Sequence, residues 1–203
     1  MMLSSGTITT FLFDLDGVIR IYLDKDTSLI EEKYGLALGT IDEIAFSNDL
    51  LIKVTTGKIK RHEWVRMIGI RMNNLQAALE WESRPVYVNR EVLDIIRKLR
   101  SIGFQVCLVT NGTDNLLNEL RRLDIDNEFI HIFNSADLGF AKPSPMVYRA
   151  ILDFCKLRPE NVAYIDDNKE NVSEAQNMGI TSLQYNGINT LKEWLKNNSL
   201  LLD

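Results

Sequence analysis

The sequence predicts an α/β fold: a Rossmann-like parallel sheet core with helices on both faces, and an inserted α-helical cap domain after the first strand. Three observations support this expectation. From residue 86 onward, short apolar runs alternate with amphipathic stretches, an order typical of parallel strands joined by helices. Between residues 21 and 85 the apolar periodicity is helical, with no strand pattern. Several apolar runs end in polar residues, and ligands of such sheets bind beyond the carboxyl ends of the strands.

The first strand is predicted at Phe11–Phe13, an apolar run that ends in Asp14, Asp16 and Gly17. Side chains two residues apart on an extended backbone point the same way, so the two carboxylates should face one spot. Like charges this close raise each other's pKa unless a cation lies between them or one carboxyl keeps a proton. The pair therefore indicates chemistry at the strand end. The alternatives are an acidic turn without function and a calcium loop, whose further ligands do not follow in this sequence.

The segment after this strand is predicted to be a cap domain of residues 21–85, inserted into a core domain formed by residues 1–20 and 86–203. Pro85 marks its end. The stretch from Lys58 to Arg71 is basic, and we interpret it as a solvated helix face rather than a surface for an anionic substrate or partner.

Within the cap, a helix is expected to begin at Thr27 or Ser28 as its cap and to continue through Tyr34. Thr40, with Glu43 three residues later, predicts a capping box at the start of the next helix. Two further amphipathic helices are expected over residues 60–72 and 75–81.

The rest of the core alternates regularly between the two kinds of element. Strands are expected at residues 105–109, 129–133, 161–165 and 181–185. Helices are expected over residues 91–102, 113–123, 144–154, 169–178 and 191–196.

Polar residues cluster where these predicted elements meet. Thr110 and Asn111 follow one strand, Asp166 and Asp167 follow another, and Lys142 precedes the helix that begins near residue 144. Each has an ordinary alternative: a turn, a helix N-cap, or a solvated lysine at a helix start. Their convergence on one sheet edge favours a site.

Charge balance at this edge indicates a cation. Several carboxylates and a phosphate dianion share a pocket only if positive charge compensates them. Carboxylate and carbonyl oxygens suit Mg²⁺, which keeps several of its waters, and Lys142 adds one more positive charge. The sequence therefore predicts a site for Mg²⁺ and a phosphoryl group.

With these motifs, led by Phe13-Asp14-Leu15-Asp16-Gly17-Val18, the chain resembles hydrolases of the haloacid dehalogenase superfamily that carry a helical cap after the first strand. The resemblance implies that Asp14 is the nucleophile and Asp16 the general acid and base. It implies that Thr110 and Asn111 bind the phosphoryl group and that Lys142 steadies both the nucleophile and the phosphate.

The resemblance also implies the metal ligands. Asp14, Asp167 and Asp16, the last through its backbone carbonyl, would hold Mg²⁺, and Asp166 would assist directly or through water. Asn171 would orient the acidic pair.

One departure from the family pattern concerns the residues after the first motif. Many members have an Asp and a small hydroxyl residue where this chain has Arg20-Ile21-Tyr22. Arg20 is predicted either to bind a second anionic group on the substrate or to form a surface salt bridge. Dehalogenase members lack the second Asp, so Asp16 favours phosphoryl chemistry.

The expected function is a Mg²⁺-dependent phosphatase that hydrolyses small phosphomonoesters through an aspartyl-phosphate. The alternatives are a phosphotransferase or phosphomutase using the same intermediate, and a non-catalytic binding module on the same scaffold. The expected partner is a small phosphorylated metabolite.

Composition excludes some other classes. The formal net charge of −5 argues against a general nucleic-acid binder. No apolar run is long enough to span a membrane, and no signal peptide is evident, so a cytoplasmic protein is expected. Cys107 and Cys155 lie in apolar contexts and are expected to be free thiols. We expect a monomer or a weak homodimer.

Overall fold

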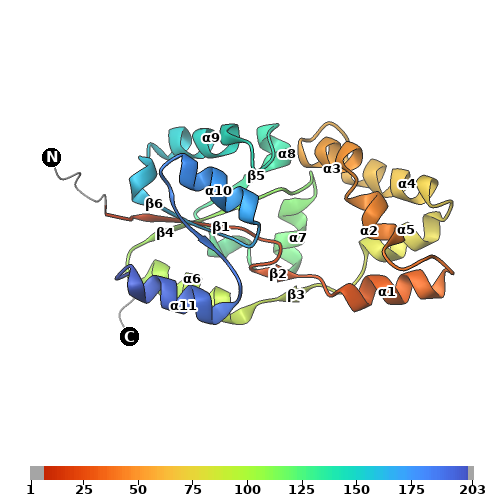
Figure 1. Ribbon diagram of the computed structural model, residues 1–203, viewed down its shortest axis with the longest axis horizontal. Helices are drawn as coiled ribbons and strands as arrows, with labels where there is room; N and C mark the ends of the chain where they lie inside the picture. Colours follow the sequence, from red (N-terminus) through yellow and green to blue (C-terminus); the bar gives the residue numbers. More distant parts are fainter. Residues whose placement is uncertain (1–6, 201–203) are drawn as a thin grey trace.

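The computed structural model describes residues 7–200, and over that range it contains a five-stranded parallel sheet in the order β5-β4-β1-β6-β7 (Figure 1). The strands are β1 Thr10–Phe13, β4 Gln105–Thr110, β5 His131–Asn134, β6 Val162–Asp166 and β7 Thr181–Gln184. The first strand of the chain therefore lies at the centre, between β4 and β6. This arrangement confirms the predicted α/β fold.

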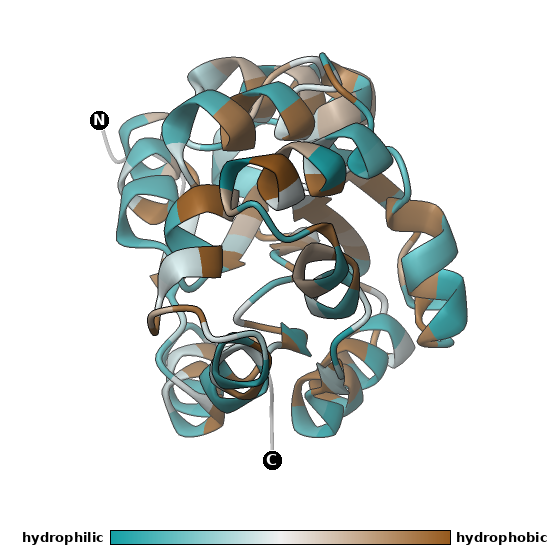
Figure 2. Cartoon of the chain, turned by 90° about the vertical axis from the view of Figure 1, so that its right-hand side faces the viewer, coloured by the Kyte–Doolittle hydropathy of each residue, from teal (hydrophilic) through white to brown (hydrophobic). Residues whose placement is uncertain are grey.

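Helices cover both faces of the sheet, because alternate side chains of β1 are buried on opposite sides. Phe11 and Phe13 pack toward one group of helices, whereas Leu12 packs toward the other. The first face is covered by α6 Arg90–Ser101, α7 Leu116–Arg122 and α11 Ile188–Asn197. The second is covered by α9 Pro145–Cys155 and α10 Lys169–Asn177. In Figure 2 most of these helices change colour along the ribbon between hydrophilic and hydrophobic, as expected for helices with one buried face.

The residues between β1 and α6 form a separate group of helices, which we call the helical segment (residues 24–82) and which lies to the right of the sheet in Figure 1. Its buried apolar residues form their own cluster, centred on Trp64 and Trp81. The chain enters and leaves through two short antiparallel strands, β2 Arg20–Ile21 and β3 Tyr87–Val88. The helices are α1 Asp24–Lys33, α2 Thr40–Ala45, α3 Asn48–Thr55, α4 Arg61–Arg71 and α5 Leu75–Glu82.

This separate cluster agrees with a cap of helices, and the boundaries at residues 20 and 86 stay a prediction. One contact between the segment and the core involves Arg61, whose guanidinium pairs with Glu119 of α7. Its backbone N–H also donates to Asp114 Oδ1 at 2.7 Å. The interpretation of the basic stretch as a solvated face is therefore wrong for Arg61.

Several helix starts differ from the prediction. Helix α1 begins at Asp24, because Asp24 and Asp26 in its first turn complement the positive helix end better than a later hydroxyl cap does. Thr40 is the first residue of α2 rather than its cap, and no capping box forms. Gly39 occupies the cap position with φ 86°, a conformation that favours glycine.

Helix α7 begins at Leu116 rather than Thr113, because the Thr113 hydroxyl accepts from the N–H of Asn115 in a turn. Four short elements were not predicted at all: α3, β2, β3 and α8 Ser135–Leu138. Two 3-10 turns, Asp126–Glu128 and Pro159–Asn161, complete the described part of the chain.

Two expectations from composition can be compared with the structure. Cys107 and Cys155 are free thiols, and burial raises the pKa of Cys107 to about 12. Within residues 7–200, every helix is too short or too polar to cross a membrane.

Candidate active site

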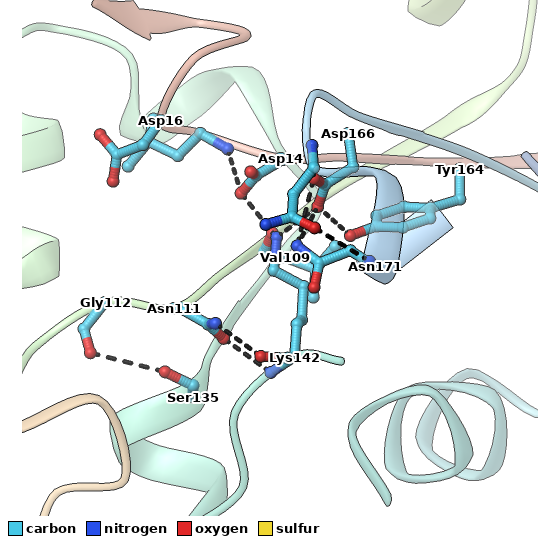
Figure 3. Close-up of polar contacts among 12 residues, drawn as sticks. Asp14, Asp16, Val109, Asn111, Gly112, Ser135, Lys142, Tyr164, Asp166 and Asn171 are labelled. Atoms are coloured by element: carbon cyan, nitrogen blue, oxygen red, sulfur yellow. Dashed lines mark hydrogen bonds and ion pairs between the residues drawn. The ribbon is translucent and has the colours of Figure 1, made fainter. Parts of the chain in front are cut away.

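The carboxyl ends of β1, β4 and β6 meet at one edge of the sheet and open onto a pocket (Figure 3). Because Phe13 is in register with Leu108 and Ile165, the residues that follow these strands come side by side. The pocket is lined by Asp14, Asp16, Gly17, Thr110, Asn111, Lys142, Asp167, Asn168 and Asn171. The structure thus brings together residues that are far apart in the sequence.

A buried ion-pair triad lies at the base of this pocket. Lys142 Nζ is 2.7 Å from Asp14 Oδ1 and 2.7 Å from Asp166 Oδ2, and all three side chains are at least nine-tenths buried. Burial raises the pKa of Asp14 to about 7, against the opposing effect of Lys142 and with a further increase from Asp166. Burial alone would lower the pKa of Lys142, but the two carboxylates outweigh it and raise that pKa above its ordinary value. Lys142 therefore stays protonated, and its charge makes the pKa of Asp14 lower than burial alone would make it.

Asp166 is held by several donors at once. Asn171 Nδ2 lies 3.1 Å and 3.0 Å from its two carboxylate oxygens, and the N–H of Asn168 donates to Oδ1 at 2.7 Å. The Tyr164 hydroxyl donates to Oδ2, and burial followed by the charge of Asp166 raises the pKa of Tyr164 so that its proton stays on. Asn171 thus orients Asp166. Tyr164 was not predicted, although its place two residues before Asp166 on β6 puts both side chains on one face.

Asp167 lies on the open side of the pocket, against the turn that follows β1. Gly17 has φ +81°, and a Cβ built there would lie only 2.1 Å from Asp167 Oδ2. A side chain at this position would therefore displace the carboxylate. Burial, with the charge of Asp166 as the second cause, raises the pKa of Asp167.

Replacing Gly17 with Ala is expected to lower the affinity for Mg²⁺, beyond the loss of folding stability that an alanine at positive φ causes. A non-glycine residue at positive φ destabilises a protein by about 1–2 kcal/mol, and the contact with Asp167 adds a displaced carboxylate. Gly39→Ala is the matched control, since Gly39 has φ +86° and no atom within 4 Å of the added Cβ. Thermal unfolding should shift similarly in both variants, and only Gly17→Ala should raise the Mg²⁺ concentration for half-maximal activity. Equal magnesium requirements would contradict this placement of Asp167.

Asp16 also lines the pocket, but its carboxylate is not part of the cluster formed by Asp14, Asp166 and Asp167. Figure 3 shows it directed away from Asp14. Arg20 Nε and Nη2 donate to its two oxygens at 2.6 Å and 2.8 Å. The expectation that both carboxylates face one spot is wrong, because extended backbone ends at Phe13 and the chain then turns so that the Ile19 N–H reaches Leu15 O.

Arg20 is paired with two carboxylates of the chain itself. Besides Asp16 it donates to Glu119 Oε2 at 2.6 Å, and its side chain is only 7% exposed. Glu119 also pairs with Arg61 of the helical segment. Of the two roles considered for Arg20, the geometry supports an ion pair, buried rather than at the surface, and gives no support to binding of a second substrate anion.

Thr110 and Asn111 follow β4 on the same edge of the sheet. Thr110 is 2% exposed and lines the pocket. The side chain of Asn111 is occupied: its Nδ2 donates to Lys142 O at 2.9 Å, and its Oδ1 accepts from the Lys142 N–H at 2.8 Å. Asn111 therefore fixes the loop that carries the lysine, a role that the sequence did not suggest.

The residues fit a divalent cation. Oxygen atoms of Asp14, Asp166 and Asp167 lie within 4.8 Å of one another, and one ammonium group faces the first two. Three carboxylates against one lysine leave an excess of negative charge, and an all-oxygen donor set suits Mg²⁺ or Ca²⁺ rather than zinc.

Comparison with known proteins identifies the family. The model of the haloacid dehalogenase-like hydrolases matches residues 8–179. A HAD family enzyme of Bacteroides thetaiotaomicron, solved with magnesium and inorganic phosphate, has the same fold, with a TM-score of 0.72 and 23% identity over 87% of this chain and 93% of that chain.

Curated relatives differ in activity and in length. Mouse bifunctional epoxide hydrolase 2 is 31% identical over 52% of this chain, and the match spans only 20% of that enzyme. A sesquiterpene phosphatase of Aspergillus oryzae is 26% identical over 86% of this chain and 90% of its own length. An (S)-2-haloacid dehalogenase of Burkholderia cepacia is 25% identical over 47% of this chain and 42% of its own length.

The family match covers most of the chain, and the motif residues meet at the sheet edge where they can act together. The chain belongs to the haloacid dehalogenase-like hydrolases.

Proposed function

We propose that this hydrolase is a Mg²⁺-dependent phosphatase that acts on small phosphomonoesters through an aspartyl-phosphate. One observation carries the proposal: Asp14 is buried, paired with Lys142, and grouped with Asp166 and Asp167 at the sheet edge. A carboxylate held this way is a nucleophile beside a cation site. The magnesium and phosphate in the Bacteroides structure and the Aspergillus phosphatase among the relatives support it.

The chain's own residues account for the chemistry. A carboxylate oxygen of Asp14 attacks phosphorus, and the bond from phosphorus to the leaving oxygen breaks as Asp16 gives that oxygen a proton. Asp16 then removes a proton from water, which attacks the phosphorus of the acyl phosphate and regenerates Asp14. Lys142 and the hydroxyl of Thr110 stabilise negative charge on the other phosphoryl oxygens.

Mg²⁺ would be held by Asp14 and Asp167, with the backbone carbonyl of Asp16 and with Asp166 assisting. When bound there, it would neutralise part of the phosphoryl charge and make phosphorus more electrophilic. Because Asp166 already accepts bonds from Lys142, Tyr164 and Asn171, its main role is to position Lys142.

The proton step requires Asp16 to leave Arg20. Its side chain is 43% exposed and bound as a carboxylate to the guanidinium, so when substrate is bound it must turn toward the leaving oxygen and take up a proton from solvent before it can donate one. This second carboxylate favours phosphoryl chemistry over the displacement of a halide, which needs no proton donor for its leaving group. A phosphotransferase would use the same residues with an acceptor hydroxyl in place of water. A small phosphorylated metabolite as substrate and a monomeric or weakly dimeric state stay predictions.

Removing divalent metal is expected to abolish activity. Phosphate release from 4-nitrophenyl phosphate should fall to background in excess chelator and return when Mg²⁺ is added in excess of the chelator. Asp167→Asn, which removes a charge from the open side of the site, should need a higher Mg²⁺ concentration for half-maximal activity. Undiminished turnover in excess chelator would refute the metal assignment.

A further inference from the structure

A cavity of about 200 Å³ lies between the helical segment and the core, next to the candidate active site. We call it the leaving-group cavity. It shares Asp16 and Asn111 with the pocket that holds Asp14, so it opens on the side where the proton donor of the proposed reaction stands. The other lining residues include the apolar side chains of Phe46, Leu51, Trp64 and Trp81 and the charged side chains of Arg20, Arg61, Arg84 and Glu119.

The wall formed by the helical segment is apolar and aromatic. The rings of Trp64 and Trp81 meet edge to face with centroids 5.4 Å apart, and Phe46 packs on Trp81 at 6.1 Å. The indole N–H of Trp64 is used within the chain, since it donates to Ala45 O at 3.1 Å. The volume suits a single ring, because an apolar cavity of about 150 Å³ is enough to bind benzene.

Most polar groups of the cavity are bonded to one another. Arg20 forms ion pairs with Asp16 and Glu119. Arg61, which borders the same space, forms ion pairs with Glu119 and Glu82. A leaving group with several hydroxyls would therefore bury donors and acceptors that find no partner, which disfavours binding.

Two lining residues are exceptions, because a buried nitrogen of each, Trp81 Nε1 and Arg84 Nε, has no hydrogen-bond partner among the described residues. The guanidinium carbon of Arg84 lies 4.2 Å from the ring centroids of both Tyr22 and Trp81, so the planar group is held between two aromatic side chains. One nitrogen, Nη1, donates to Trp81 O at 2.8 Å, while the buried Nε has no partner. In residues 7–200 no carboxylate forms an ion pair with it. A fixed positive charge, without an ion-pair partner in residues 7–200, thus borders an apolar space.

We propose that the leaving-group cavity selects the alcohol part of the substrate: an apolar group the size of one six-membered ring that carries a carboxylate paired with Arg84. This inference rests on the proposed phosphatase function. It names a substrate class, the phosphomonoesters of ring-sized carboxylic-acid alcohols, and it excludes sugar phosphates as preferred substrates.

The test compares three phosphates that share the same CH₂–O–phosphate group, so that leaving-group chemistry is nearly constant. They are glucose 6-phosphate, cyclohexylmethyl phosphate and 4-carboxycyclohexylmethyl phosphate. Wild-type kcat/KM should rise in that order, by about tenfold or more at each step. Acetyl phosphate, which has almost no leaving group to place in the cavity, reports whether the phosphoryl site works.

Two variants locate the effect. Arg84→Met should remove most of the advantage of the carboxylated ring over the plain ring, whereas Arg66→Met, which removes the charge of an exposed arginine on α4, should keep it. Leu51→Phe, which narrows the cavity, should reduce turnover of both apolar rings more than that of acetyl phosphate. Circular dichroism checks that each variant is folded. If a variant is not folded, the order of kcat/KM for the three phosphates with the wild-type protein still tests whether the cavity selects a carboxylated ring.

The outcomes separate the two proposals. If no phosphate is released from any of the four compounds, the proposed function fails. If acetyl phosphate is hydrolysed but glucose 6-phosphate equals or exceeds the apolar rings, the phosphatase stands and the leaving-group cavity is wrong. If the plain ring is preferred and the carboxylate adds nothing, the pairing with Arg84 is wrong.

Discussion

Asp14→Asn is expected to lower phosphate release by about 10⁴-fold or more while leaving the protein folded, since an amide of the same shape cannot attack phosphorus. Lys142 keeps its pairing with Asp166 in this variant, so the buried charge remains compensated. Intact-mass measurement after acid quenching should find no phosphate adduct on the variant. Normal turnover, or an adduct on another residue, would overturn the proposed mechanism.

Asp16→Asn serves as the matched variant because it keeps the nucleophile and removes the proton donor. General acid–base catalysis is worth about 10²–10⁴-fold, so turnover should fall strongly here as well. A substrate with a good leaving group needs little protonation, so Asp14 should still become phosphorylated. Hydrolysis should then lag for want of a base, and the adduct should accumulate. The two variants thus differ in kind, an adduct on one and none on the other.

Lys142→Met is expected to destabilise the protein by about 3–5 kcal/mol as well as to remove activity. The substitution leaves Asp14 and Asp166 buried without their cation, and breaking a buried ion pair from one side has costs of this size. Urea unfolding in chelator measures the change, with Lys169→Met, at an exposed position, as the control. A loss no larger than that of Lys169→Met would contradict the account of the triad.

The pH dependence of this loss has a definite sign. Without Lys142 the folded-state pKa of Asp14 rises further above its unfolded value, so the folded state binds more protons than the unfolded state over a wider range. In the wild type this pKa is already about 7, so both proteins lose stability alike below that pH, and the stability of the variant relative to wild type should fall as pH rises from about 7 to about 9. Unfolding curves at both ends of that range test this, and an equal loss at both would indicate that the carboxylates are not the cause.

The sequence was a good guide to the fold because the main elements depend on local patterns. The apolar run at Phe11–Phe13 and the alternation after residue 86 correspond to the observed sheet. The position of the site could also be predicted, because polar residues that follow buried parallel strands lie at the same edge of the sheet. Helix starts were less predictable, as at Thr40, where a glycine with positive φ took the cap position.

The site was harder to predict because its details depend on contacts between distant residues. Nothing near Arg20 in the sequence indicates Glu119, yet this pair and Arg61 decide where the Asp16 carboxylate points. Likewise the side chain of Asn111 binds the Lys142 backbone, 31 positions away. The alternation of side chains on β6 places Tyr164 and Asp166 on one face of the strand. A tyrosine in an apolar run is typical of a core residue, however, so its hydrogen bond to Asp166 was not predicted.

The pairing of β2 with β3 holds the two ends of the helical segment side by side. Residues 22–86 therefore form a long loop whose two ends are already fixed next to each other. The entropy of closing a loop grows only with the logarithm of its length, and halving or doubling it changes the free energy by about 0.6 kcal/mol. The stability of the sheet therefore places almost no constraint on how long the insertion is. What constrains its content is contact with the core, as at Arg61, whose ion pair with Glu119 an insertion of another sequence would have to keep or replace to hold Asp16 in its present direction.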